Sequence, residues 1–97
     1  MPKVNVETPS SHSKEKTFEI VQSLLSNDAD LKKIDPNYSC EFNAANCSGK
    51  IYGSKFDAEI EIKEQSVSMT VEIPFMLSPF KGQIKDNLEK KLTQALS

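Results

Sequence analysis

Arginine is absent from this chain of 97 residues, and all 12 of its basic residues are lysines. They stand against 14 acidic residues, so the formal net charge is -2. Arginine is the usual residue for forked recognition of phosphates and base edges, and nucleic-acid-binding domains usually carry a basic excess. The composition therefore argues against nucleic-acid binding, although a weak lysine contact on one face stays open.

Histidine and cysteine are also scarce. His12 is the only histidine, and the two cysteines are Cys40 and Cys47. A zinc site needs clustered ligands, and no second ligand lies at CxxC-type spacing from any of these residues. We predict no metal and no cofactor, and we expect both cysteines to be reduced thiols that pack as small apolar residues.

Long hydrophobic runs are missing as well. No stretch approaches the roughly 18 apolar residues of a membrane-spanning helix, and the opening MPKVNVETPSSHSK lacks the apolar region of a signal peptide. We therefore expect a cytoplasmic protein without a transmembrane segment. The length predicts one domain, residues 1–97, with a modest core.

The small size limits what the interior can hold. Such a domain is stable by roughly 5 to 15 kcal/mol, and an empty cavity costs on the order of 24 cal/mol per Å³. An empty pocket of about 300 Å³ would therefore cost roughly 7 kcal/mol. We expect a filled interior unless a ligand usually occupies it.

The first third of the chain predicts a strand, a helix and a loop. Residues 3–8 alternate and stop at a proline, which is typical of a short edge strand. Serines at 10, 11 and 13 precede apolar residues at three- and four-residue spacing, which predicts a helix from about Ser13 to Ser26. Residues 27–37 contain Pro36 and are predicted to form a short helical turn and a loop.

Two hairpins are predicted in the middle of the chain. Residues 38–42 and 47–51 alternate on either side of the loop 43–46. Residues 55–74 give the clearest pattern, because a turn near Lys63–Ser66 pairs every apolar residue with another: Ile62 with Val67, Ile60 with Met69, Ala58 with Val71, and Phe56 with Ile73. This register also places Asp57 opposite Glu72, a like-charge pair on the solvent side.

The segment IPFMLSPFKGQI, residues 73–84, joins the last strand to a closing helix. Ser78 is predicted as the helix N-cap and Pro79 as its first residue. A stripe with a spacing of four then predicts a helix of roughly five turns: Phe80, Ile84, Leu88, Leu92 and Leu96. The predicted fold class is α+β, an antiparallel sheet of about five strands in the order β-α-β-β-β-β-α, with the long C-terminal helix across one sheet face.

Two stretches carry a resemblance to a known family. The end, PFMLSPFKGQIKDNLEKKL, and the opening, MPKVNVETPSSHS, resemble the polyhydroxyalkanoic acid system proteins, or granule-region proteins, which are small bacterial chains found near polyester storage functions. The resemblance covers nearly the whole chain and implies a non-enzymatic accessory protein that binds a polyester granule surface or a granule protein. The element order is also similar to a shortened helix-grip or START-like fold, whose larger members hold an apolar ligand between sheet and helix.

No catalytic constellation emerges from the sequence. His12 is interpreted as a polar residue at a helix start rather than as a proton-transfer group. Glu59 and Glu61 share a strand face beside other charged residues, so solvation explains them better than paired-carboxylate chemistry does. Neither G-x-S-x-G nor a phosphate-cradling glycine run occurs. We expect no catalytic residues and no enzyme.

The apolar residues Phe75, Met76, Leu77 and Phe80 have two interpretations. Burial in the corner between sheet and helix is favoured for most of them. The alternative is an exposed patch that binds a granule surface or a partner protein, and this patch is the candidate binding site.

Three residues beside the corner complete that candidate site. Lys81 is expected near the exposed amides of a helix N-terminus, a natural anion site, and Lys85 extends the basic side. Gly82 costs about 1 kcal/mol relative to alanine inside a helix, so a close approach of helix to sheet is favoured as its reason over anion binding.

A rival hypothesis is that a small acyl or aromatic ligand binds between the sheet and the closing helix. The residues predicted to line that pocket are Phe56, Ile60, Met69, Val71, Ile84 and Leu88. A homodimer through the edge strand at Val4–Glu7, or through the corner, is also open.

Overall fold

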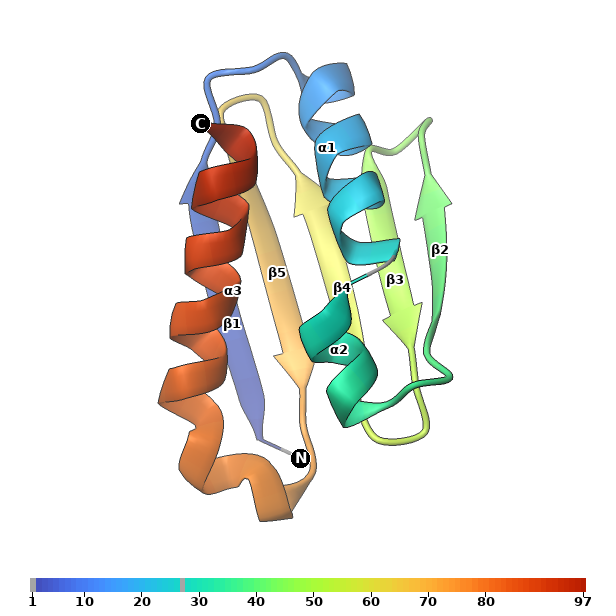
Figure 1. Cartoon of the computed structure of the whole chain (residues 1–97). Helices are drawn as coiled ribbons and strands as arrows, with labels where there is room; N and C mark the ends of the chain where they lie inside the picture. The colour runs from blue at the N-terminus through green and yellow to red at the C-terminus, as the bar shows by residue number, and fades with distance from the viewer. Residues whose placement is uncertain (1, 27) are drawn as a thin grey trace.

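The computed structural model describes residues 2–26 and 28–97 and contains a five-stranded antiparallel sheet with its helices on one face (Figure 1). The strands are β1 (Lys3–Pro9), β2 (Ser39–Asn43), β3 (Ser48–Tyr52), β4 (Asp57–Ile62) and β5 (Ser66–Glu72). The helices are α1 (Lys14–Ser26), α2 (Ala29–Ile34) and α3 (Lys81–Leu96), and a 3-10 helix, η1 (Phe75–Phe80), links β5 to α3. The predicted α+β class and strand order along the chain are confirmed.

The sheet order is β1-β5-β4-β3-β2, so β1 is an edge strand as predicted. Helix α3 packs over β1, while α1 packs over β2 and β4 and also contacts α3. Helix α2 lies within the segment predicted as a helical turn and loop, of which Asn27 lies outside the described residues. The chain therefore builds two layers, with one sheet face covered and the other open to solvent (Figure 1).

The register of β4 and β5 is the predicted one, with Ile60 opposite Met69 and Asp57 opposite Glu72. The like-charge pair has a third member, because Lys3 of β1 also pairs with Glu72 and places its ammonium 3.6 Å from that carboxylate. The lysine offsets the repulsion, and its exposure keeps the gain small.

The hairpin of β2 and β3 turns at residues 44–47, one residue later than predicted, and Cys47 has a positive φ of 48°. The ring of Phe42 covers Gly49, the residue opposite it in the register. Phe42 also meets Phe18 of α1 edge to face, with ring centroids 5.9 Å apart. This aromatic contact ties the edge hairpin to the helix layer.

The sequence predicted the N-terminus of α1 correctly and that of α3 incorrectly. Ser13 caps α1, since its Oγ accepts a hydrogen bond from the Lys16 N–H at 3.2 Å. The predicted N-cap Ser78 and first residue Pro79 are wrong for α3, because both lie in η1 and α3 begins at Lys81. A 3-10 helix rises about 2 Å per residue, so η1 carries the chain from the end of the sheet to the helix layer.

Candidate functional site

The corner after β5 is exposed rather than buried. Phe75, Met76 and Phe80 are 77%, 79% and 52% exposed, and only Leu77 is half-buried against the core. The expectation of burial was therefore wrong for three of the four residues. The reason is positional, because η1 lies beyond the end of the sheet at the foot of α3 (Figure 1). We call Phe75, Met76, Leu77 and Phe80 the apolar corner.

The stripe of α3 explains why the corner emerges from the core. Leu88, Leu92 and Leu96 are buried, Ile84 is half-buried and Phe80 is exposed. The C-terminal part of α3 therefore packs on the sheet, while its N-terminal turns extend past the packed core.

The basic side of the corner is also open. Lys81 and Lys85 are exposed on the first turns of α3. A Cβ atom added at Gly82 would meet nothing within 4 Å, so the expected close approach of helix to sheet at Gly82 is wrong.

An open apolar groove of about 230 Å³ begins at the corner and lies between α2 and α3. It is lined by Leu31, Ile34, Val71, Leu77, Phe80, Gln83, Ile84, Asn87, Leu88 and Lys91. Three residues of the predicted ligand pocket, Val71, Ile84 and Leu88, line this groove. The other three, Phe56, Ile60 and Met69, are buried in the core.

The groove combines a hydrocarbon lining with a polar rim. Ile84 and Leu88 of α3 follow the apolar stripe that begins at Phe80. Gln83 directly precedes Ile84, and Asn87 directly precedes Leu88, so the two amides are also four residues apart on α3. Both amide side chains are exposed. Side-chain amides both donate and accept hydrogen bonds, so the rim can bind carbonyl groups while the lining packs against alkyl groups.

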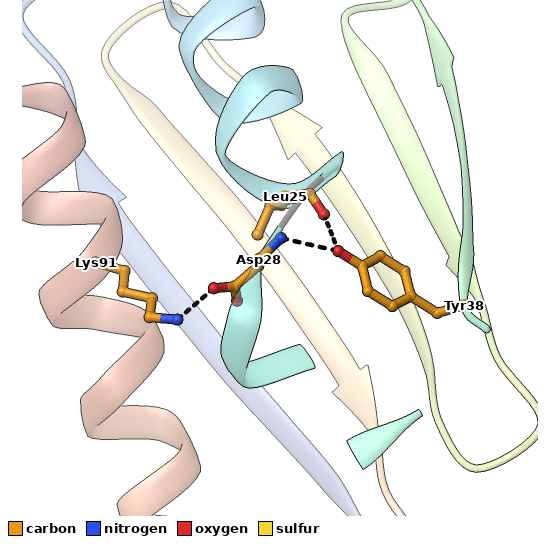
Figure 2. Close-up of polar contacts among 4 residues, drawn as sticks. All are labelled: Leu25, Asp28, Tyr38 and Lys91. Carbon is orange, nitrogen blue, oxygen red and sulfur yellow. Dashed lines mark hydrogen bonds and ion pairs between the residues drawn. The ribbon is translucent and has the colours of Figure 1, made fainter. Parts of the chain in front are cut away.

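Lys91 also lines the groove. Its side chain reaches a buried carboxylate (Figure 2). Its ammonium donates to Oδ1 of Asp28, whose side chain is buried at the start of α2. The Asp28 N–H donates to the Tyr38 hydroxyl at 3.0 Å, and this hydroxyl donates to the Leu25 carbonyl at 2.7 Å. The network fixes α3 against the junction of α1 and α2, and burial raises the pKa of Tyr38.

The sequence model of a family described as "Putative polyhydroxyalkanoic acid system protein" matches residues 6–96. The chain belongs to this family. Comparison with curated proteins and with solved structures gives no match. The match to this polyhydroxyalkanoic acid (PHA) system family covers the residues of both the corner and the groove.

Another anchored carboxylate of this chain is structural. Asp35, after α2, accepts hydrogen bonds from the N–H groups of Asn37 at 3.1 Å, Ser54 at 2.6 Å and Lys55 at 3.3 Å. The Ser54 hydroxyl adds a bond at 3.1 Å. These bonds, the Asn37 one foremost, lower the pKa of Asp35. Asp35 thus joins the end of α2 to the loop between β3 and β4.

The remaining candidates do not assemble into a site. His12 is half-buried before α1, with its backbone N–H bonded to Ser10 Oγ at 3.2 Å, and Glu59 and Glu61 are exposed on the open sheet face. Cys40 and Cys47 are free and half-buried, as expected, and burial raises the pKa of the Cys40 thiol.

Among the side chains that the structure describes in residues 2–26 and 28–97, no cluster of three or more histidine, cysteine or acidic groups could hold a metal. In this same part of the chain no helix has the length and apolar character needed to span a membrane.

Sequence reasoning predicted only Val71, Ile84 and Leu88 of the groove lining, and it missed the Asp28–Lys91 pair. The polar stripe of Gln83, Asn87 and Lys91 beside the apolar one was a signal for a groove along α3. Asp28 and Lys91 are 63 positions apart, and no local sequence pattern indicates that they pair.

Proposed function

We propose that this protein is a non-enzymatic, cytoplasmic accessory protein of a bacterial PHA storage system, and that it binds the polyester surface of a storage granule. The binding site is the apolar corner, with Lys81, Gly82 and Lys85 beside it. The observation that carries the proposal is the exposure of Phe75, Met76 and Phe80 on one 3-10 helix. Exposed apolar patches of this kind mark surfaces that bind other apolar surfaces.

The strength of this contact can be bounded. Burying one large apolar side chain contributes about 1.5–3 kcal/mol, so three give roughly 4–9 kcal/mol before the costs of association are subtracted. The costs of association reduce this gross gain, so a single molecule is expected to bind reversibly, with a dissociation constant no tighter than about micromolar. Lys81 and Lys85 suit the carbonyl oxygens and carboxylate chain ends of a polyester.

The test is sedimentation of the purified protein with PHA granules. We compare the wild type with a triple variant, Phe75→Ser, Met76→Ser and Phe80→Ser, and with the control Tyr52→Ser. Tyr52 is 45% exposed on the open sheet face, so the control also removes an exposed aromatic side chain. We expect the triple variant to bind at least about tenfold more weakly and the control to bind like the wild type.

Two outcomes would contradict the proposal. If the wild type sediments no better with granules than with inert silica particles, the polyester surface is not its target. If it binds protein-coated granules but not bare polyester, the corner instead recognises a granule protein.

Homodimerisation through the β1 edge or through the corner stays a prediction. Sedimentation velocity over a range of protein concentrations checks it, because a dimer would dissociate on dilution. Loss of a dimer in the triple corner variant would place the contact at the corner instead of at β1.

A further inference from the structure

We infer that the groove between α2 and α3 holds a segment of a single polyester chain drawn from the surface on which the apolar corner rests. This inference rests on the proposed function and names the ligand of the adjoining site. Leu77 and Phe80 belong to both the corner and the groove, so one chain can pass from the surface into the groove without crossing polar protein.

The size of the groove fits a chain segment. A volume of about 230 Å³ corresponds to roughly eight water-sized units at about 30 Å³ each. Pockets for whole small molecules usually measure about 300–1,000 Å³. The groove therefore has room for a segment of about eight non-hydrogen atoms, or somewhat more than one repeat of a short-chain polyester.

The lining and the rim match the chemistry of a polyester. Leu31 and Ile34 of α2 lie across from Ile84 and Leu88 of α3, and these side chains can pack against the alkyl parts of the chain. The Cα atoms of Gln83 and Asn87 are about 6 Å apart along the helix axis, at 1.5 Å per residue, so both amides start from the same side of α3. Each can donate to an ester carbonyl, which gives roughly a two- to tenfold preference for an ester over a hydrocarbon.

The part of the groove beside Lys91 favours a neutral chain. Lys91, which lines this part, donates to the carboxylate of buried Asp28, so the two charges meet each other there. The groove therefore does not depend on a ligand charge, and esters are neutral along their whole length.

The source of the chain follows from the expected affinity. A fragment of about eight non-hydrogen atoms with ordinary ligand efficiency binds in the millimolar range. When the apolar corner is bound to a granule surface, the local concentration of polyester chain segments beside the groove is high. Binding of one segment in the groove then adds a second contact, even though its intrinsic affinity is weak. We therefore assign the groove to the polymer and not to a free acyl compound.

The experiment is an NMR titration of the full chain with two soluble probes, the methyl ester of a linear 3-hydroxybutanoate trimer and 1-octanol. We expect the trimer to cause saturable shifts at Ile34, Ile84 and Asn87 with a millimolar dissociation constant, and 1-octanol to bind several-fold more weakly. Absence of saturable shifts at these residues, or equal affinity for the two probes, would overturn the inference.

Variants of the rim sharpen the test. The pair Gln83→Met and Asn87→Leu removes the amides while keeping long side chains on α3, and we expect it to weaken trimer binding by at least about fourfold. Gln94→Met on the exposed side of α3 is the matched control and should leave the affinity unchanged. An unchanged affinity in the rim variant, with its fold intact by circular dichroism, would contradict the role of the amides.

The two proposals fail in different ways. If the wild type sediments with granules but the trimer does not enter the groove, the inference is wrong and the proposed function stands. If the trimer binds the groove but the protein does not sediment with granules, the proposed function is wrong, and so is the assignment of the groove to a surface-held polymer.

Discussion

At the scale of single residues, Asp35 shows how one side chain can organise a loop. Its carboxylate collects backbone donors from Asn37, Ser54 and Lys55. A Cβ atom at Gly53 would lie 2.7 Å from Oδ2 of Asp35, so glycine at 53 leaves the room that the carboxylate needs. Four hydrogen bonds to the charged form stabilise it and hold the pKa of Asp35 below its ordinary value.

The lowered pKa of Asp35 predicts a pH dependence of stability. A carboxyl group whose pKa is lower in the folded state contributes stability above its unfolded pKa of about 3.9, and this contribution is lost as the pH falls through the folded pKa. We expect Asp35→Asn to lower the free energy of unfolding at pH 7 and to make its decline below about pH 4 shallower. Urea unfolding at pH 7 and pH 3 measures both effects.

The control for this prediction is Asp86→Asn, an exposed residue of α3. It should keep the wild-type pH profile. A profile for Asp35→Asn that runs parallel to the wild type would show that the hydrogen bonds do not favour the ionised carboxyl.

Replacing glycine with alanine is expected to have opposite effects on stability at positions 82 and 49. Gly82→Ala should raise stability by up to about 1 kcal/mol, because alanine favours helix and nothing lies within 4 Å of the new methyl group. Gly49→Ala should lower stability by about 1–3 kcal/mol, because the new methyl group would lie 2.5 Å from the ring of Phe42. Thermal unfolding of both variants measures the two changes in stability. A loss of stability in Gly82→Ala would show that the backbone at this position requires glycine.

At the scale of elements, the Asp28–Lys91 pair decides how α3 sits against α1 and α2. Asp28 is buried, Lys91 is one-quarter exposed, and the Tyr38 hydroxyl completes the junction. Replacing only Lys91 leaves an uncompensated buried charge, which is far more costly than removing both members of the pair.

This asymmetry predicts the outcome of a double-mutant cycle. We expect Lys91→Met to cost roughly 2–4 kcal/mol, somewhat below the loss for a fully buried pair. Lys91→Met combined with Asp28→Asn should recover a large part of that loss, because no net charge remains buried. Urea unfolding measures the cycle, and strictly additive effects would contradict coupling between the two residues.

At the scale of the whole molecule, the acidic surface and the exposed apolar surface lie in different places. The open sheet face carries carboxylates that outnumber its lysines: Glu7, Glu41, Asp57, Glu59, Glu61 and Glu72 against Lys3 and Lys50. The apolar corner lies at one end of the molecule beside Lys81 and Lys85 (Figure 1). The proposed contact would therefore leave the acidic face in water.

This arrangement predicts the orientation of the protein on a granule. When granule-bound protein is treated with an amine-acetylating reagent, Lys81 and Lys85 should react more slowly than in free protein. Lys50, exposed on the acidic face, should react at the same rate in both. Mass spectrometry of the digested protein measures each lysine, and equal protection of Lys50 would refute this orientation.

Much of the fold could be predicted from short-range pattern. The side chains of a strand alternate with a period of two, so matching the apolar faces of residues 56–62 and 67–73 leaves one register, which the structure of β4 and β5 has. Helix α1 was predictable because its cap and its apolar spacing lie within one segment. The sequence by itself therefore determined the five strands, the two long helices, their order along the chain and the faces that these strands and helices bury.

Only the tertiary structure decided what happens where elements meet. An apolar residue is buried only if another element covers it, and no property of Phe75 or Met76 says that η1 lies beyond the sheet. The groove exists because α2 and the start of α3 stand apart over Val71, and Lys91 meets Asp28 because the fold brings them together. Local periodicity fixes which way a side chain faces within its own element, whereas exposure, grooves and ion pairs depend on distances between elements far apart in the chain.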